Sequence, residues 1–242
     1  MSRKWIGGLF AIAVVAFLFA PSASRAESTM KFGITGFGGY NTYAMDDVND
    51  AIDEVNADPD VQSAGISVDK ISGGFGLGGG VQLWAADSWV ISAEYERLMA
   101  STKDEGSVLG TPVSVELKVP ANSFVLTGAY LFPSASKARF GLGAGVGYYS
   151  TSGTQEVSSP GISFSDEANG NGIGFHFLGV MDYAASSQVH LGLRAGYRVA
   201  KTKDLEDSAG DKVYNLDGSE AQVDWSGLMT RAGITFMLGG AD

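Results

Sequence analysis

The chain of 242 residues contains no cysteine, two histidines and six prolines. Without cysteine it forms no disulfide, offers no thiolate to a metal and cannot be anchored as a lipoprotein. The motifs GxxxxGK[ST], HExxH and CxxC are also missing. A formal net charge of -11 without a basic patch argues against a nucleic-acid partner.

Long apolar runs are missing too, except at the start of the chain. After residue 26 no segment reaches 18 consecutive apolar residues, so we expect no transmembrane helix in the rest of the chain. What the chain does have is 34 glycines and 45% hydrophobic residues. The remaining classes are a soluble exported protein and a barrel in an outer membrane.

The first 26 residues have the three parts of a secretory signal peptide. A short basic segment precedes an apolar stretch, residues 6–20, that is too short to span a membrane readily as a helix. Ser24 and Ala26 satisfy the small-x-small cleavage rule. We expect cleavage after Ala26, which leaves a barrel domain of residues 27–242; an uncleaved anchor is the alternative.

The stretch 70–99 alternates with a period of two, which is typical of strands because successive side chains leave opposite faces. Each of its two runs has roughly 10 residues, the length that a tilted strand needs to cross a bilayer. One face carries glycines and carboxylates. The opposite, apolar face consists of Ile71, Phe75, Leu77, Val81, Leu83, Trp89, Ile91, Ala93 and Tyr95.

Six further segments alternate in the same way, which gives about eight strands. They are residues 30–40, 124–132, 139–149, 173–183, 189–199 and 227–238. The connections alternate between short (85–88, 133–137 and 184–187) and long (41–69, 101–118, 151–172 and 201–224). A soluble sandwich has no reason to sort its loops in this way. The sequence therefore predicts an all-β protein, an eight-stranded antiparallel up-and-down transmembrane β-barrel with short periplasmic turns and long extracellular loops.

Aromatic residues gather near the ends of the apolar faces, where a bilayer has its two interfaces. At the turn side they are Trp89, Phe132, Tyr183 and Phe236, and at the loop side Tyr40, Tyr95, Tyr148 and Tyr197. Aromatics of a sandwich core would not cluster at strand ends. The pattern favours a lipid-facing wall.

The predicted inner face carries charge, and buried charges need partners. We expect a network with Glu94, Glu96, Arg194 and Arg231 at mid-height, Arg198 higher, and Arg139, Asp182 and His190 near the periplasmic end. It either forms a polar core or lines a gate.

The partners across the strands follow from an assumed register of the two hairpins. If Leu83 pairs with Trp89, Gly78 faces Glu94 and Gly76 faces Glu96, so that glycines make room for the carboxylates. By the same logic Asp182 pairs with His190, and Leu178 pairs with Arg194.

The first long connection is acidic, with eight Asp or Glu residues between positions 46 and 69. Met45, Val48, Ile52 and Val55 recur at helical spacing, which predicts a short amphipathic helix at the barrel mouth. It either plugs the mouth or packs against other loops. The acidic face is either plainly solvated or collects divalent cations at a lipopolysaccharide surface; no EF-hand pattern is present, and we predict no metal site.

The architecture over residues 30–238 resembles the small outer-membrane barrels OmpX, OmpW and the membrane domain of OmpA. Within it, residues 231–238 look like the terminal-strand signal read by the barrel-assembly machinery, with Gly233, Phe236 and Leu238 at its defining positions. The resemblance implies that machinery, outer-membrane lipid and lipopolysaccharide as partners. It implies a monomer in the outer membrane of a Gram-negative bacterium.

The two histidines, His176 and His190, have inward parity, and neither has a serine two residues away on its strand. A lipid A-modifying hydrolase would need a nucleophile beside a base near the lipid surface. We therefore predict no catalytic residue and no cofactor. The expected role is structural, envelope-maintaining or surface-binding, with a porin-like narrow channel for small or apolar solutes as the alternative.

Overall fold

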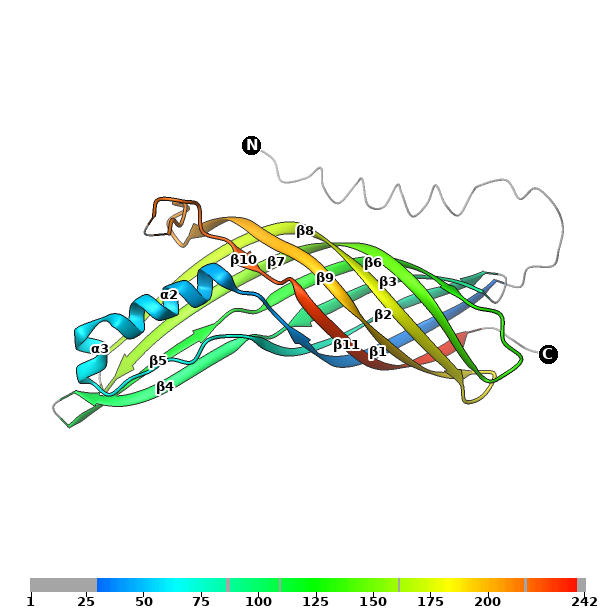
Figure 1. Cartoon of the computed structure of the whole chain (residues 1–242), viewed down its shortest axis with the longest axis horizontal. Helices are drawn as coiled ribbons and strands as arrows, with labels where there is room; N and C mark the ends of the chain where they lie inside the picture. The colour runs from blue at the N-terminus through cyan, green and yellow to red at the C-terminus, as the bar shows by residue number, and fades with distance from the viewer. Residues whose placement is uncertain (1–29, 86–87, 109, 161, 216, 239–242) are drawn as a thin grey trace.

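Eight strands of the computed structural model form a closed ring, in which each strand pairs antiparallel with the next and the last pairs with the first (Figure 1). Phe32 of the first strand lies opposite Leu238 of the last. This confirms the predicted eight-stranded up-and-down barrel. The wall consists of β1 (Lys31–Thr42), β2 (Gly73–Ala85), β3 (Trp89–Leu98), β6 (Ala121–Leu131), β7 (Ala138–Ser159), β8 (Ile162–Ala184), β9 (Val189–Asp207) and β11 (Gly227–Leu238).

The signal peptide predicted over residues 1–26 lies outside the part of the chain that the structure describes. The described residues are 30–85, 88–108, 110–160, 162–215 and 217–238. None of the helices in these ranges has the length and apolar character needed to span a membrane.

The barrel is apolar outside and polar inside because its strands alternate in the pleat. On β8, Phe177 is 67% exposed, whereas His176 and Leu178 on either side of it are 1% and 3% exposed. Phe75 and Leu142 repeat the pattern on other strands, each 64% exposed. An apolar belt on this scale is the lipid-facing surface of a transmembrane barrel.

Part of what the sequence predicted as long loops is strand. β4 (Ser101–Val108) and β5 (Thr111–Lys118) form a hairpin, and β7 and β8 continue together past the barrel as far as Ser159 and Ile162. β5 pairs with this extension of β7, so a sheet projects from the extracellular end (Figure 1). β10 (Val223–Asp224) adds a short pairing to β9.

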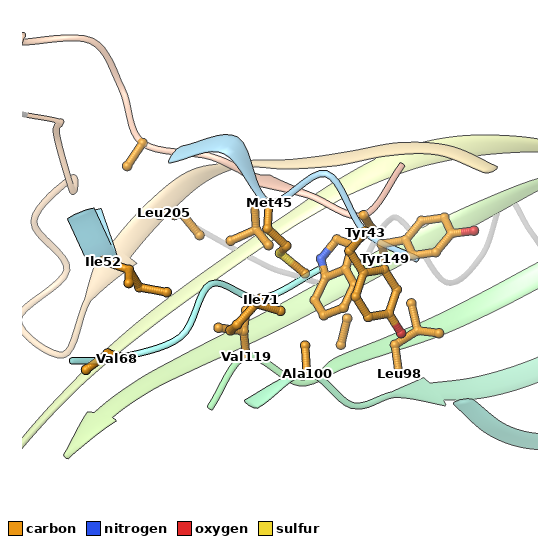
Figure 2. Packing of buried hydrophobic residues seen from close by; sticks show 14 of the residues in the cluster. Tyr43, Met45, Ile52, Val68, Ile71, Leu98, Ala100, Val119, Tyr149 and Leu205 are labelled. Atoms are coloured by element: carbon orange, nitrogen blue, oxygen red, sulfur yellow. The ribbon is translucent and has the colours of Figure 1, made fainter. Parts of the chain in front are cut away.

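The predicted amphipathic helix is present as α2 (Asp46–Ala57) and is followed by α3 (Pro59–Ser63). It lies along the sheet extension (Figure 1). Its apolar face, with Ile52 3% exposed, joins an apolar core that fills the space between helix and sheet. Figure 2 shows this core reaching from Ile52 and Val68 to Tyr43 and Tyr149 at the mouth of the barrel.

The predicted register of both hairpins is wrong by two residues. Leu83 pairs with Ile91 rather than Trp89, so Glu94 lies opposite Gly80 and Glu96 opposite Gly78. β2 continues two residues further than assumed before the chain turns back, because Ala85 rather than Leu83 is paired with Trp89, and the turn is correspondingly shorter. In the second hairpin, Asp182 pairs with Gly192, His190 with Ala184, Leu178 with Gly196 and Arg194 with Val180. A shift of two keeps every side chain on its predicted face.

Candidate functional site

The lower cluster lies at the periplasmic end of the lumen and is centred on Asp182. Arg139 Nη2 donates to Asp182 Oδ2 at 2.8 Å, and His190 Nδ1 lies 3.1 Å from both oxygens of the same carboxylate. Trp84 packs against both partners, with the Arg139 guanidinium 4.6 Å and the His190 ring 5.3 Å from its centroid. Asp182 thus holds two basic side chains, one from each neighbouring strand.

The central cluster lies at mid-height and joins two carboxylates to three guanidiniums. Arg231 bridges the two acids, donating to Glu94 at 3.3 Å and to Glu96 at 2.6 Å. Arg194 donates to Glu94 at 2.5 Å, and Arg198 donates to Glu96 at 3.1 Å. The Arg231, Glu94 and Glu96 side chains are at most 2% exposed. Each of the five charged groups therefore has at least one hydrogen-bonded partner of opposite charge, which lowers the cost of burying it.

Small residues create the space that these side chains occupy. A Cβ on Gly76 would lie 2.5 Å from Glu96 Oε1, and one on Gly145 would lie 2.5 Å from His176 Nε2. The ring of Phe37 fills the other side, with the Arg231 guanidinium 4.9 Å from its centroid. The space beside these inward glycines is thus filled by neighbouring side chains and leaves no wide cavity.

An aromatic layer closes the lumen above the central cluster. The Tyr149 ring lies 5.6 Å from the Arg198 guanidinium, and the Tyr43 ring meets the Trp225 ring edge to face at 4.9 Å. Trp225 is fully buried and donates from Nε1 to Thr151 Oγ1 at 2.8 Å. Tyr43 and Tyr149 also contribute to the apolar core of Figure 2, so the mouth is sealed by aromatic and aliphatic side chains.

The remaining space beside the two charge clusters is small. One cavity, bordered by Trp84, Asp182 and Arg194, has a volume of about 30 Å³. Another, bordered by Phe37, Arg194 and Arg231, has a volume of about 20 Å³. Each is comparable with the space of a single water molecule.

The histidine side chains are buried inside the lumen rather than at an accessible surface. His176 is 1% exposed, and its Nε2 lies 2.9 Å from Thr127 Oγ1. His190 is 9% exposed and contacts Asp182. The described part of the chain contains no group of three His, Asp or Glu side chains arranged to hold a metal ion.

The assembly-signal residues lie on the strand that closes the ring. Phe236 and Leu238 are on the outer wall, 56% and 53% exposed, opposite Ile34 and Phe32 of β1. Gly233 lies opposite Phe37, where a Cβ would come 2.8 Å from a β1 backbone oxygen. Their recognition by the assembly machinery stays a prediction.

The extracellular part contains most of the acidic residues and a large apolar cavity. Segments 43–72, 99–120, 151–172 and 201–226 contain 21 of the 27 acidic residues and 6 of the 16 basic ones. Between α2 and the sheet extension is a cavity of about 400 Å³. The sequence predicts the acidic residues and the helix. The cavity depends on β5 and on the parts of β7 and β8 beyond the barrel, which the sequence patterns did not identify as strands.

The sequence analysis also missed several residues of the lumen. Phe37 and Trp84 have the inward parity of the charged residues and could have been found by it. Trp225 gives no such signal, because it lies between β10 and β11 in a segment without alternation.

Comparison with protein-family models and with curated protein sequences finds no match. Among solved structures the chain is similar to a major outer membrane protein from Thermus thermophilus, with 16% identity, a TM-score of 0.49, and 86% of this chain and 99% of that chain covered.

The outer membrane protein OprG from Pseudomonas aeruginosa gives 14% identity, a TM-score of 0.45 and coverage of 87% and 96%. The outer membrane protease OmpT from Escherichia coli gives 13% identity, a TM-score of 0.34 and coverage of 90% and 100%. These similarities assign no activity to this chain, because fold alone does not determine function.

Proposed function

We propose that this protein is a non-conducting, non-enzymatic barrel of a Gram-negative outer membrane, and that it anchors a rigid acidic structure for binding at the cell surface. The lipid-facing apolar belt and the closed antiparallel ring support the membrane location, since barrels of this type span bacterial outer membranes.

The observation that carries the proposal is the filling of the lumen at three heights. The Asp182 cluster, the Glu94–Glu96–Arg231 cluster and the Trp225 layer follow one another from the periplasmic end to the extracellular mouth. Opening a path would separate buried ion pairs, and each separation costs several kcal/mol. The charged interior therefore serves as the polar core of the barrel.

The positions of the histidines support a non-enzymatic role. A hydrolase acting on membrane lipid needs its base at the lipid or aqueous surface, where the substrate is. His176 and His190 are instead buried in the lumen and hydrogen-bonded to Thr127 and Asp182. We assign neither of them a catalytic role.

The extracellular part supports surface binding because it is built as structured sheet and helix. β7 continues for 11 residues beyond Tyr148, a length of roughly 36 Å for a strand. α2 is fastened to it through the apolar core. Asn49 fastens α2 to the segment before β2, because its amide side chain donates to Ile71 O at 3.0 Å and accepts from Ile71 N–H at 2.8 Å. A binding surface of this kind is preorganised.

Conductance in planar lipid bilayers tests the proposal. Refolded protein, shown to be folded by faster migration of the unheated than the boiled sample on a detergent gel, is expected to give no steady current steps. The matched comparison is Trp225→Ala, which removes the largest fully buried side chain of the outer layer. Regular ion-selective steps from the unchanged protein would support the narrow-channel alternative and overturn the proposal.

A further inference from the structure

The extracellular cavity of about 400 Å³ has apolar walls on two sides. One wall is α2, with Val48, Ile52 and Val55, and the other is the sheet extension, with Val115 of β5 and Leu205 of β9. A volume of this size lies in the range of small-molecule sites. It is more than ten times the volume of either cavity beside the lumen clusters.

Carboxylates edge this cavity on β8 and β9, and none of the described residues that line it is basic. Asp207 is occupied, because its Oδ1 accepts from the backbone N–H groups of Ala209 and Asp211 at 2.9 Å. Asp166 lies on the inward face of β8 with Ala168, whereas Glu167 lies on the opposite face because successive side chains of a strand alternate. Asp166 is exposed and, among the described residues, forms no ion pair. It can therefore meet the charge of a ligand.

The surroundings reinforce that preference. α2 begins with Asp46 and Asp47 and has no basic residue in its last turn. An anion approaching the cavity meets repulsion from these acids, whereas a cation is attracted. The apolar walls in turn reject a small inorganic cation, because its hydration would be lost without compensation.

We propose that this cavity binds a small organic cation: a compact apolar body that lies between α2 and the sheet, with an ammonium group directed to Asp166. This deepens the surface-binding role and rests on it. Binding requires no change in the barrel, since the cavity lies outside the membrane-spanning part.

The chain offers a matched pair of variants for filling the cavity. Gly153 lines it from β7, and a Cβ there would lie 3.8 Å from Ala168 O, an ordinary contact. Gly153→Leu therefore places a side chain in the cavity without backbone strain. Gly36→Leu is the control, because Gly36 is on the outer wall and a Cβ there meets nothing within 4 Å.

The probes are three adamantane derivatives with one apolar body and different heads: 1-adamantylamine, 1-adamantanol and 1-adamantanecarboxylate. Binding to the protein in lipid nanodiscs is measured by isothermal titration calorimetry, with empty nanodiscs subtracted. We expect the amine to bind roughly tenfold or more tightly than the alcohol, and the carboxylate to bind most weakly.

Two variants distinguish the contribution of the ligand's apolar body from the contribution of its charge. Gly153→Leu is expected to weaken the amine and the alcohol alike, by about tenfold or more. The variant Asp166→Asn is expected to bring the amine down to the affinity of the alcohol and to leave the alcohol unchanged. Gly36→Leu is expected to bind as the unchanged protein does.

The proposal is overturned if the three probes bind equally, or if Gly153→Leu binds the amine as well as Gly36→Leu does. Its failure is distinguishable from failure of the surface-binding role. A conducting barrel that still binds the amine contradicts only the closed lumen, whereas a silent barrel without amine binding contradicts only the cavity ligand.

Discussion

Glycine has different roles on the two faces of the barrel wall. Gly80, on the inner face of β2, lies where a Cβ would come 2.2 Å from Ala93 O and 2.8 Å from Glu94 Cα. These are backbone atoms of β3, which cannot move aside without disturbing the strand pairing. Gly36, on the outer face of β1, has open space where its Cβ would be.

We therefore predict that Gly80→Ala lowers the free energy of unfolding by about 1–3 kcal/mol, as overpacking does elsewhere. The control Gly36→Ala is expected to stay within about 0.5 kcal/mol. Urea unfolding in phospholipid vesicles, followed by tryptophan fluorescence, measures both. Equal stability of the two variants would contradict the close approach of β2 to β3.

At the scale of single elements, sequence patterns identified those that have a regular apolar repeat. The barrel strands follow from alternation, and α2 from the spacing of Val48, Ile52 and Val55. β5 could have been found in the same way, since Val113, Val115 and Leu117 alternate with polar residues. β4 could not, because Lys103 to Ser107 has no apolar side chain and its strand depends on pairing with β5.

An ion pair of Asp224 joins β10 to β9. Asp224 Oδ2 lies 2.9 Å from Lys201 Nζ on β9, and its Oδ1 accepts from Ser226 N–H at 2.9 Å. Burial raises the pKa of Asp224, but the hydrogen bonds from Lys201 and Ser226 outweigh burial and hold this pKa below its usual value. The carboxylate therefore fixes the short segment that carries Trp225 over the mouth.

We expect Asp224→Asn to lower the free energy of unfolding by about 1.5–3 kcal/mol at pH 7, the range for hydrogen bonds to a charged group. Because the folded-state pKa is depressed, this contribution is complete above the ordinary pKa of 3.8 and is lost as the pH falls through the folded-state value. The gap between the two proteins should thus close in acid.

Unfolding free energies of both proteins at a series of pH values from 7 to 2 measure that gap. Asp211→Asn is the control, since the Asp211 side chain is exposed and forms no ion pair within the described residues. A gap that persists unchanged at the lowest pH would show that the carboxylate charge is irrelevant.

Across the whole molecule, the central charge cluster connects three strands that are distant in the chain. Glu94 and Glu96 extend from β3, Arg194 and Arg198 from β9, and Arg231 from β11. Inward parity predicted which side chains share the lumen. Which side chains become partners depends on the strand register. An error of two residues in the length of a turn shifts a side chain along the barrel axis, so the sequence alone did not determine the ion pairs.

Loss of Arg231 is expected to destabilise the entire barrel. Arg231→Leu leaves Glu96 with Arg198 and Glu94 with Arg194 but removes two charged hydrogen bonds. At about 1.5–3 kcal/mol for each bond, we predict a loss of about 3–6 kcal/mol. Urea unfolding in vesicles measures it. Lys212→Leu, at an exposed ion pair, is the control and should change the free energy by less than about 1 kcal/mol.

The closure of β11 onto β1 has a further consequence for the order of the chain. Because Phe32 and Leu238 are paired neighbours, a short linker could join the two ends, and the chain could instead be opened at the tight turn between Ala184 and Val189. Such a circular permutant retains every strand pairing. The position of the chain termini therefore does not affect the strand pairing of the folded barrel. It affects only the order in which the strands form.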